Sequence, residues 1–267
     1  MAINKIDSLK RYRAIIILSE IGALLHDLGK CDGRFLKKYR KDLREDKDYV
    51  HGKIIDYDKD LLSNLGLLDF FNTPLSNLVA PFIPATDQIL KTWNLNSVAL
   101  KDIIEKHHEG EIKPNEKLLG FVKLADKKDS ADDRLMPLAK QEGKSCLASP
   151  FGIEIEVDED SLKKLREDFY HKLAEKWKYF GINLSSDNAL LLLRLLREHI
   201  LAEWKKVSSR TPAETRRAAN DVTLWDHSYA TASIAKALMI EDILNNFLSS
   251  LPSKASIHWE KSYEFSV

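Results

Sequence analysis

Only two cysteines, Cys31 and Cys146, occur among the 267 residues. Two thiols cannot form a four-cysteine zinc site, and they do not indicate a disulfide-stapled secreted domain. We therefore expect a protein that works in the reducing cytoplasm.

The sequence also lacks an excess of either charge, since 41 Lys and Arg residues balance 41 Asp and Glu residues. No overall positive field indicates a nucleic-acid partner, so such binding would depend on a local patch or a metal site. Five arginines fit either a local basic rim or a scatter of solvated side chains: Arg194, Arg197, Arg210, Arg216 and Arg217.

No apolar run here has the length and purity of a membrane span. The run over 14–25 contains Ser19 and Glu20, which makes it too short and too polar to cross a bilayer. No small-residue cleavage site follows it, as a signal peptide would require. We interpret the run as a buried core helix and expect no membrane partner.

Helical periodicity covers most of the chain. Around 137–160, proline and glycine interrupt it, and 153–157 alternates like a short strand. Thr211-Pro212-Ala213-Glu214 predicts a helix start with proline at the first position. The sequence predicts an all-α fold with one small β-hairpin, in a single domain over 1–267 that contains a helical elaboration over 137–210. The main helices are expected near 9–28, 97–109, 115–133, 162–177, 187–207 and 227–248.

Four predicted helices place ligand-type residues at one end of an apolar face. A lone histidine there is usually a satisfied core residue, but a carboxylate buried without a partner costs several kcal/mol. Both observations are explained if the helix ends converge on a divalent cation, because imidazole and carboxylate are natural ligands of such ions. The residues are His26 and Asp27, His107 and His108, Asp126, and His227.

The order of these residues resembles the HD superfamily of metal-dependent phosphohydrolases. The segment His26-Asp27-Leu28-Gly29-Lys30 matches the central motif of that family, and His107-His108 and Ala125-Asp126 follow in the family's order. The resemblance implies that a lone histidine, the His-Asp pair and the distant aspartate hold one metal. It implies that the intervening histidines hold a second.

One departure from this family is the position of the lone histidine. Residues 1–25 contain no histidine, whereas His227 lies in the segment 221–228 before an alanine-rich helix. This circularly permuted order is similar to the HD domain of the large subunit of type III CRISPR effector complexes. The resemblance extends over about 14–240 and is weak over 137–205.

The resemblance implies a phosphodiesterase that cleaves single-stranded DNA with one or two ions of manganese, nickel, cobalt or magnesium. Asp27 would bridge two metals and help to activate a water whose pKa falls towards about 7. Lys30 is expected to contact the scissile phosphate, although a surface lysine near a helix C-terminus is the alternative. His51 is equally compatible with a ligand and with a solvated loop histidine.

The expected partners are the other subunits of a type III CRISPR effector complex and its palm domains. The chain has no Gly-Gly-Asp-Asp motif, so we expect an isolated domain, a separately encoded subunit or a truncated piece. The alternating segment 259–265 favours truncation. Two other functions remain open: a nucleotide phosphohydrolase with the same metal site, and a non-catalytic scaffold.

Several further polar residues have weaker signals. Asp129 and Asp133 can extend the face of Asp126, but we interpret them as a solvated acidic helix end. His171, His199 and His258 have no companions and are expected to be structural or exposed.

Overall fold

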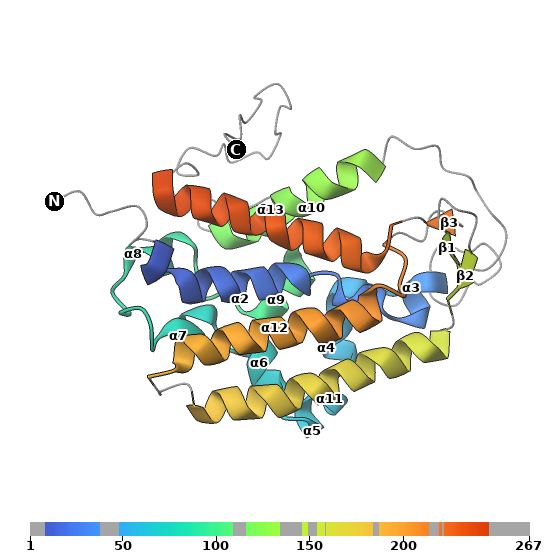
Figure 1. The fold of residues 1–267 in the computed structure, drawn as a ribbon, viewed down its shortest axis with the longest axis horizontal. Helices are drawn as coiled ribbons and strands as arrows, with labels where there is room; N and C mark the ends of the chain where they lie inside the picture. Colours follow the sequence, from blue (N-terminus) through green and yellow to red (C-terminus); the bar gives the residue numbers. More distant parts are fainter. Residues whose placement is uncertain are drawn as a thin grey trace.

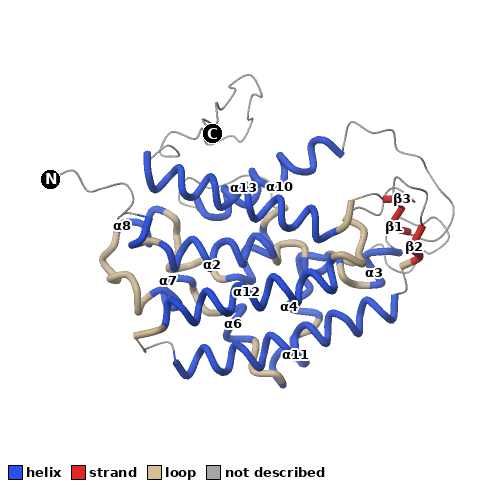
Figure 2. Tube along the Cα trace, in the orientation of Figure 1, coloured by secondary structure: helices blue, strands red, loops and turns tan. Residues whose placement is uncertain are grey.

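The computed structural model describes nine stretches of the chain, namely 9–37, 48–108, 116–133, 146–148, 154–157, 159–183, 187–213, 219–220 and 222–245. Over these residues the fold is an all-α bundle with one small three-stranded sheet at its end (Figure 2). This confirms the predicted fold class. The segment 259–265 and His258 lie outside the described residues.

Five long helices run roughly along the long axis of the molecule (Figure 1). Helix α2 packs against α12 and α13, while α10 packs on α13 and α11 packs on α12. Every residue of α2 from Ala14 to Leu24 is buried, which confirms the predicted core helix. The long helices are α2 (Arg13–Leu24), α10 (Lys117–Asp133), α11 (Glu159–Asn183), α12 (Ala189–Ser208) and α13 (Leu224–Asn245).

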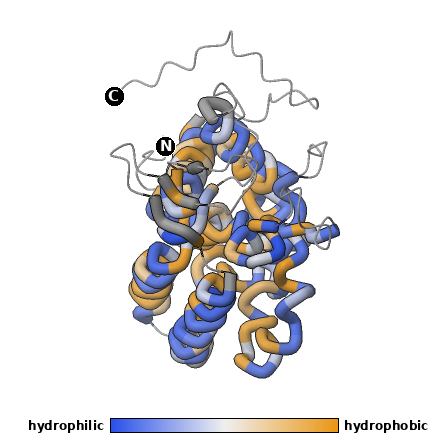
Figure 3. Tube along the Cα trace, turned by 90° about the vertical axis from the view of Figure 1, so that its right-hand side faces the viewer, coloured by the Kyte–Doolittle hydropathy of each residue, from blue (hydrophilic) through white to orange (hydrophobic). Residues whose placement is uncertain are grey.

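Short helices fill the sequence between α2 and α10. Of these, η2 contacts both η1 and α9, and α9 also contacts α2. Polar and apolar stretches alternate along the helices, as expected for amphipathic elements (Figure 3). They are η1 (Leu28–Lys30), α3 (Gly33–Lys37), η2 (His51–Lys53), α4 (Ile54–Tyr57), α5 (Lys59–Asn64), α6 (Leu68–Asn72), α7 (Leu75–Val79), α8 (Gln88–Thr92) and α9 (Leu100–Lys106).

The small sheet contains the predicted hairpin. Strands β1 (Cys146–Ala148) and β2 (Glu154–Glu156) are antiparallel, and β3 (Ala219–Asn220) pairs parallel to β1. The predicted helix start at Pro212 is wrong, because Pro212 forms an antiparallel bridge with Thr223. The fixed φ of proline suits an extended edge as well as a first helical turn, so the motif did not separate the two.

The predicted basic rim has one member that is already paired. Arg197 donates to Glu20 of the buried helix α2, with Nε 2.8 Å from Oε2, so this arginine ties α12 to the core. Arg194 and Arg210 are exposed, and Arg216 and Arg217 lie outside the described residues. Among the described helices, none combines the length and hydrophobicity needed to cross a bilayer.

Candidate metal centre

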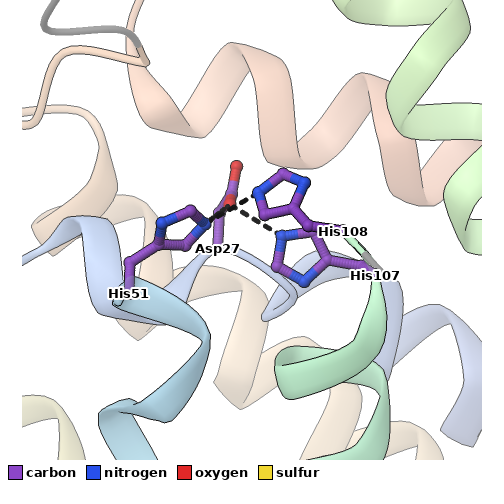
Figure 4. Close-up of side chains that lie close together, drawn as sticks. All are labelled: Asp27, His51, His107 and His108. Atoms are coloured by element: carbon purple, nitrogen blue, oxygen red, sulfur yellow. Dashed lines mark hydrogen bonds and ion pairs between the residues drawn. The ribbon is translucent and has the colours of Figure 1, made fainter. Parts of the chain in front are cut away.

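The Asp27 carboxylate lies at the centre of a cluster of histidines contributed by separate parts of the chain. Its Oδ2 is 3.2 Å from His26 Nε2 and 3.2 Å from His227 Nε2. Its Oδ1 is 3.2 Å from His51 Nε2 and 3.3 Å from His107 Nε2 (Figure 4). The two oxygens of one buried carboxylate therefore face two different pairs of imidazoles.

Asp126 and His108 extend the cluster at opposite ends. Asp126 Oδ1 lies 3.3 Å from His227 Nε2 and 3.9 Å from His26 Nε2. His108 Nε2 lies 2.9 Å from His51 Nε2. The structure thus brings together every metal ligand that the sequence predicts. We call His26 and His227, together with Asp126 beside them, the first group, and His51, His107 and His108 the second group, with Asp27 shared between them.

Helix ends orient two of the histidines. His26 follows the end of α2 and His107 follows the end of α9, where the last carbonyls of a helix have no partner within it. His26 Nδ1 lies 2.7 Å from Ala23 O, and His107 Nδ1 lies 2.7 Å from Ile104 O. Because each Nδ1–H donates to a carbonyl, the Nε2 atom of each ring is turned towards Asp27.

Glycines allow the ligand-bearing segments to approach closely. A Cβ on Gly29 would lie 2.0 Å from His51 O, so only glycine lets η1 contact η2 at this distance. A Cβ on Gly52 would lie 3.1 Å from Glu105 O of α9, and one on Gly22 would meet side chains of α9. The sequence alone does not indicate these contacts.

Lys30 belongs to the cluster and is not a free surface lysine. Its Nζ lies 2.7 Å from Asp27 Oδ2 and donates to Ala213 O at 3.0 Å. Its side chain is 13% exposed, which leaves the ammonium close to the solvent edge of the cluster.

Unpartnered polar atoms are concentrated in this cluster. Among the described residues, ten buried side-chain nitrogen or oxygen atoms have no hydrogen-bond partner, and five of them belong to Asp27, His26, His107 and His227. Buried polar atoms are normally hydrogen-bonded, and a cation is one of the few groups that can satisfy nitrogen lone pairs and carboxylate oxygens together. The donor set therefore fits a divalent metal ion.

The protonation states of the carboxylates suit metal binding. Burial tends to raise the pKa of Asp27, but Lys30 and His26 hold it well below its usual value. Burial also tends to raise the pKa of Asp126, but the adjacent His227 imidazole lowers it below its usual value. Both carboxylates are therefore anionic near pH 7.

The pKa is lowered at two histidines of the cluster and raised at a third. Burial lowers the pKa of His51, and burial followed by the charge of His107 lowers the pKa of His108 to about 3. Burial also disfavours the charged form of His227, but the adjacent carboxylates of Asp126 and Asp129 outweigh it and raise that pKa to about 11. A metal that binds His227 must therefore displace a proton.

The expectation that Asp129 belongs to a solvated helix end is wrong, because its Oδ2 lies 2.5 Å from His227 Nδ1. Its spacing of three residues from Asp126 was the available signal, because residues three apart share a helix face. Of the other histidines, His171 is exposed, while His199 contacts Lys172 O of α11 away from the cluster.

Comparisons of the chain with protein-family models, with curated proteins and with solved structures found no match.

Proposed function

We propose that this chain is a phosphodiesterase of the HD type that holds two divalent cations and cleaves single-stranded DNA. The observation that carries the proposal is the division of the Asp27 carboxylate, whose Oδ2 faces the first group and whose Oδ1 faces the second. With Asp27 shared, each group offers four residues with nitrogen or oxygen ligands, which suits a site for two metal ions. The chemistry that such cations supply is the activation of a water and the neutralisation of phosphate charge.

The ligand types favour transition metals over magnesium. Five imidazoles and two carboxylates surround the centre, and imidazole nitrogen suits transition metals such as nickel, whereas magnesium prefers oxygen ligands. The second group, with three histidines and one carboxylate oxygen, carries this preference most strongly.

The residues at the solvent edge fit a phosphate-bearing substrate. His108 is exposed and Lys30 is partly exposed, so two side chains of the cluster are in contact with solvent. Ala213 O fixes the Lys30 ammonium beside Asp27, where a lysine acts as a point charge for a phosphate oxygen. Single-stranded DNA as substrate, and action within a type III CRISPR effector complex, rest on the permuted motif order that ends in His227.

A nuclease assay with matched variants tests the proposal. We expect the protein to cleave labelled single-stranded DNA with Mn²⁺ and to stop on addition of EDTA. Loss of a hydrogen-bond partner behind a ligand typically lowers activity about 10–100-fold, so Asp27→Ala should lose more than about 100-fold. Asp60→Ala, which removes an exposed aspartate of α5, is the matched control and should cleave like the wild type.

Two outcomes would redirect the proposal. Hydrolysis of nucleoside phosphates with single-stranded DNA left intact would make the chain a nucleotide phosphohydrolase. Tight Mn²⁺ binding without hydrolysis of any phosphate ester would leave it a scaffold.

A further inference from the structure

We infer that Asp129 is a positioning residue that fixes the His227 imidazole so that its Nε2 faces the first group. The inference rests on the proposed metal centre. Asp129 Oδ2 lies 2.5 Å from His227 Nδ1, while His227 Nε2 lies 3.2 Å from Asp27 Oδ2 and 3.3 Å from Asp126 Oδ1. The two ring nitrogens therefore have separate tasks.

His227 needs this contact because of its place in its helix. His26 and His107 follow the C-terminal ends of their helices and donate Nδ1–H to free carbonyls three residues back. His227 instead lies in the first turn of α13, and a helix N-terminus presents free N–H groups, not free carbonyls. Helix α13 thus cannot supply the acceptor, and Asp129 of α10 supplies it.

The packing of α10 on α13 positions Asp129 beside His227. Asp126 and Asp129 are three residues apart, so they share the face of α10 that meets α13. Asp126 approaches Nε2 and Asp129 approaches Nδ1, so the pair holds the ring from both edges. A carboxylate that accepts from Nδ1–H also raises the basicity of Nε2 as a metal ligand.

The position of Asp129 distinguishes it from a direct ligand. It contacts the ring nitrogen that points away from Asp27, and it is in neither the first nor the second group. Its removal should therefore weaken metal binding without removing a coordinating atom.

Calorimetric titration of the metal-free protein with Mn²⁺ measures this effect. We expect Asp129→Ala to weaken binding at one of the two sites about 10–100-fold, the usual effect of losing a partner behind a metal-binding histidine. Asp129→Asn should fall between the wild type and Asp129→Ala, because its amide oxygen still accepts from Nδ1–H but carries no charge. Asp168→Ala, at an exposed position of α11, is the matched control and should bind like the wild type.

A spectroscopic measurement separates orientation from general loss of structure. In ¹⁵N NMR of the Zn²⁺-loaded protein, His227 should carry its proton on Nδ1 in the wild type and in Asp129→Asn. Equal Mn²⁺ affinity in the wild type and in Asp129→Ala would overturn the inference while leaving the metal centre intact. No Mn²⁺ binding by the wild type would overturn the metal centre itself.

Discussion

Arg166 and Asp27 are both charged and both buried, but their surroundings are built differently. Arg166 donates from Nε to Asp58 Oδ2 at 2.9 Å and from Nη2 to Asp58 Oδ1 at 3.2 Å. Its Nη1 donates to Cys31 O and lies 2.9 Å from Asp32 Oδ2. Around Arg166, every charged atom therefore meets one of opposite character.

Around Asp27, by contrast, carboxylate oxygens and imidazole nitrogens lie close together without forming a complete set of hydrogen bonds. Among the described residues, neither Asp27 oxygen accepts a hydrogen bond and Oδ2 has the Lys30 ammonium as an ion-pair partner, whereas every side-chain nitrogen and oxygen of Arg166, Asp58 and Asp32 is hydrogen-bonded or ion-paired. The Arg166 cluster is complete as protein alone, as expected for a structural network. The Asp27 cluster instead has the donor set of an ion-binding site. Both clusters contain buried charge, so buried charge by itself does not identify a functional site. The two clusters differ in whether the protein supplies partners for all of their polar atoms.

The comparison predicts its largest effect at Arg166. Arg166→Met leaves the half-buried Asp58 without its cation and leaves Asp32 with Arg34 as its remaining partner, which should lower the free energy of unfolding by about 3–5 kcal/mol. Urea denaturation should give the same loss in EDTA and in Mn²⁺. Arg194→Met, at an exposed position of α12, should unfold like the wild type. A loss that disappears in Mn²⁺ would contradict the structural role.

The next effect is stabilisation by metal, which only the Asp27 cluster should give. Mn²⁺ at one hundred times its dissociation constant should raise the free energy of unfolding by about 2.7 kcal/mol, and EDTA should reverse this. Asp27→Asn should lose the gain because both groups share that carboxylate. Arg166→Met should keep it, since its cluster holds no ligand. A gain that survives in Asp27→Asn would place the ion elsewhere.

The sequence pointed to the candidate ligands because each stands out locally. His26, His107, Asp126 and His227 are polar residues that continue apolar helical faces, and such faces point to the core. The all-α class followed from the same periodicity. The prediction that His227 lies beside the other candidate ligands rested on the resemblance in motif order, because periodicity carries no information about which helices meet.

Contacts between distant segments are what the sequence could not provide. Arg166 lies 108 residues from Asp58, and nothing in the stripe of α11 distinguishes it from a solvated arginine. The partner of Asp129 could not be predicted because an acidic helix end has the same local sequence whether its carboxylates contact water or an imidazole. Helix α2 also ends at Leu24, several residues before Gly29, and this earlier end is what frees the carbonyl that holds His26.

The smallest predicted effect is that of a larger residue at Gly29. Such a residue should disturb the second group of candidate ligands and leave the first group intact. In Gly29→Ala, the Cβ would lie 2.0 Å from His51 O, so η2 must shift and carry His51 away from Asp27. Such overpacking should destabilise the fold by about 1–3 kcal/mol. Bound manganese, measured by mass spectrometry, should fall from two ions to one, because His26, Asp126 and His227 do not depend on η2.

Gly181→Ala is the matched control for this prediction. A Cβ at Gly181 of α11 meets nothing within 4 Å, and alanine favours a helix by up to about 1 kcal/mol. This variant should therefore hold two manganese ions and unfold no more easily than the wild type. If Gly29→Ala also retained both ions at unchanged affinity, His51 would not be a ligand, and the second group would depend on His107 and His108 alone.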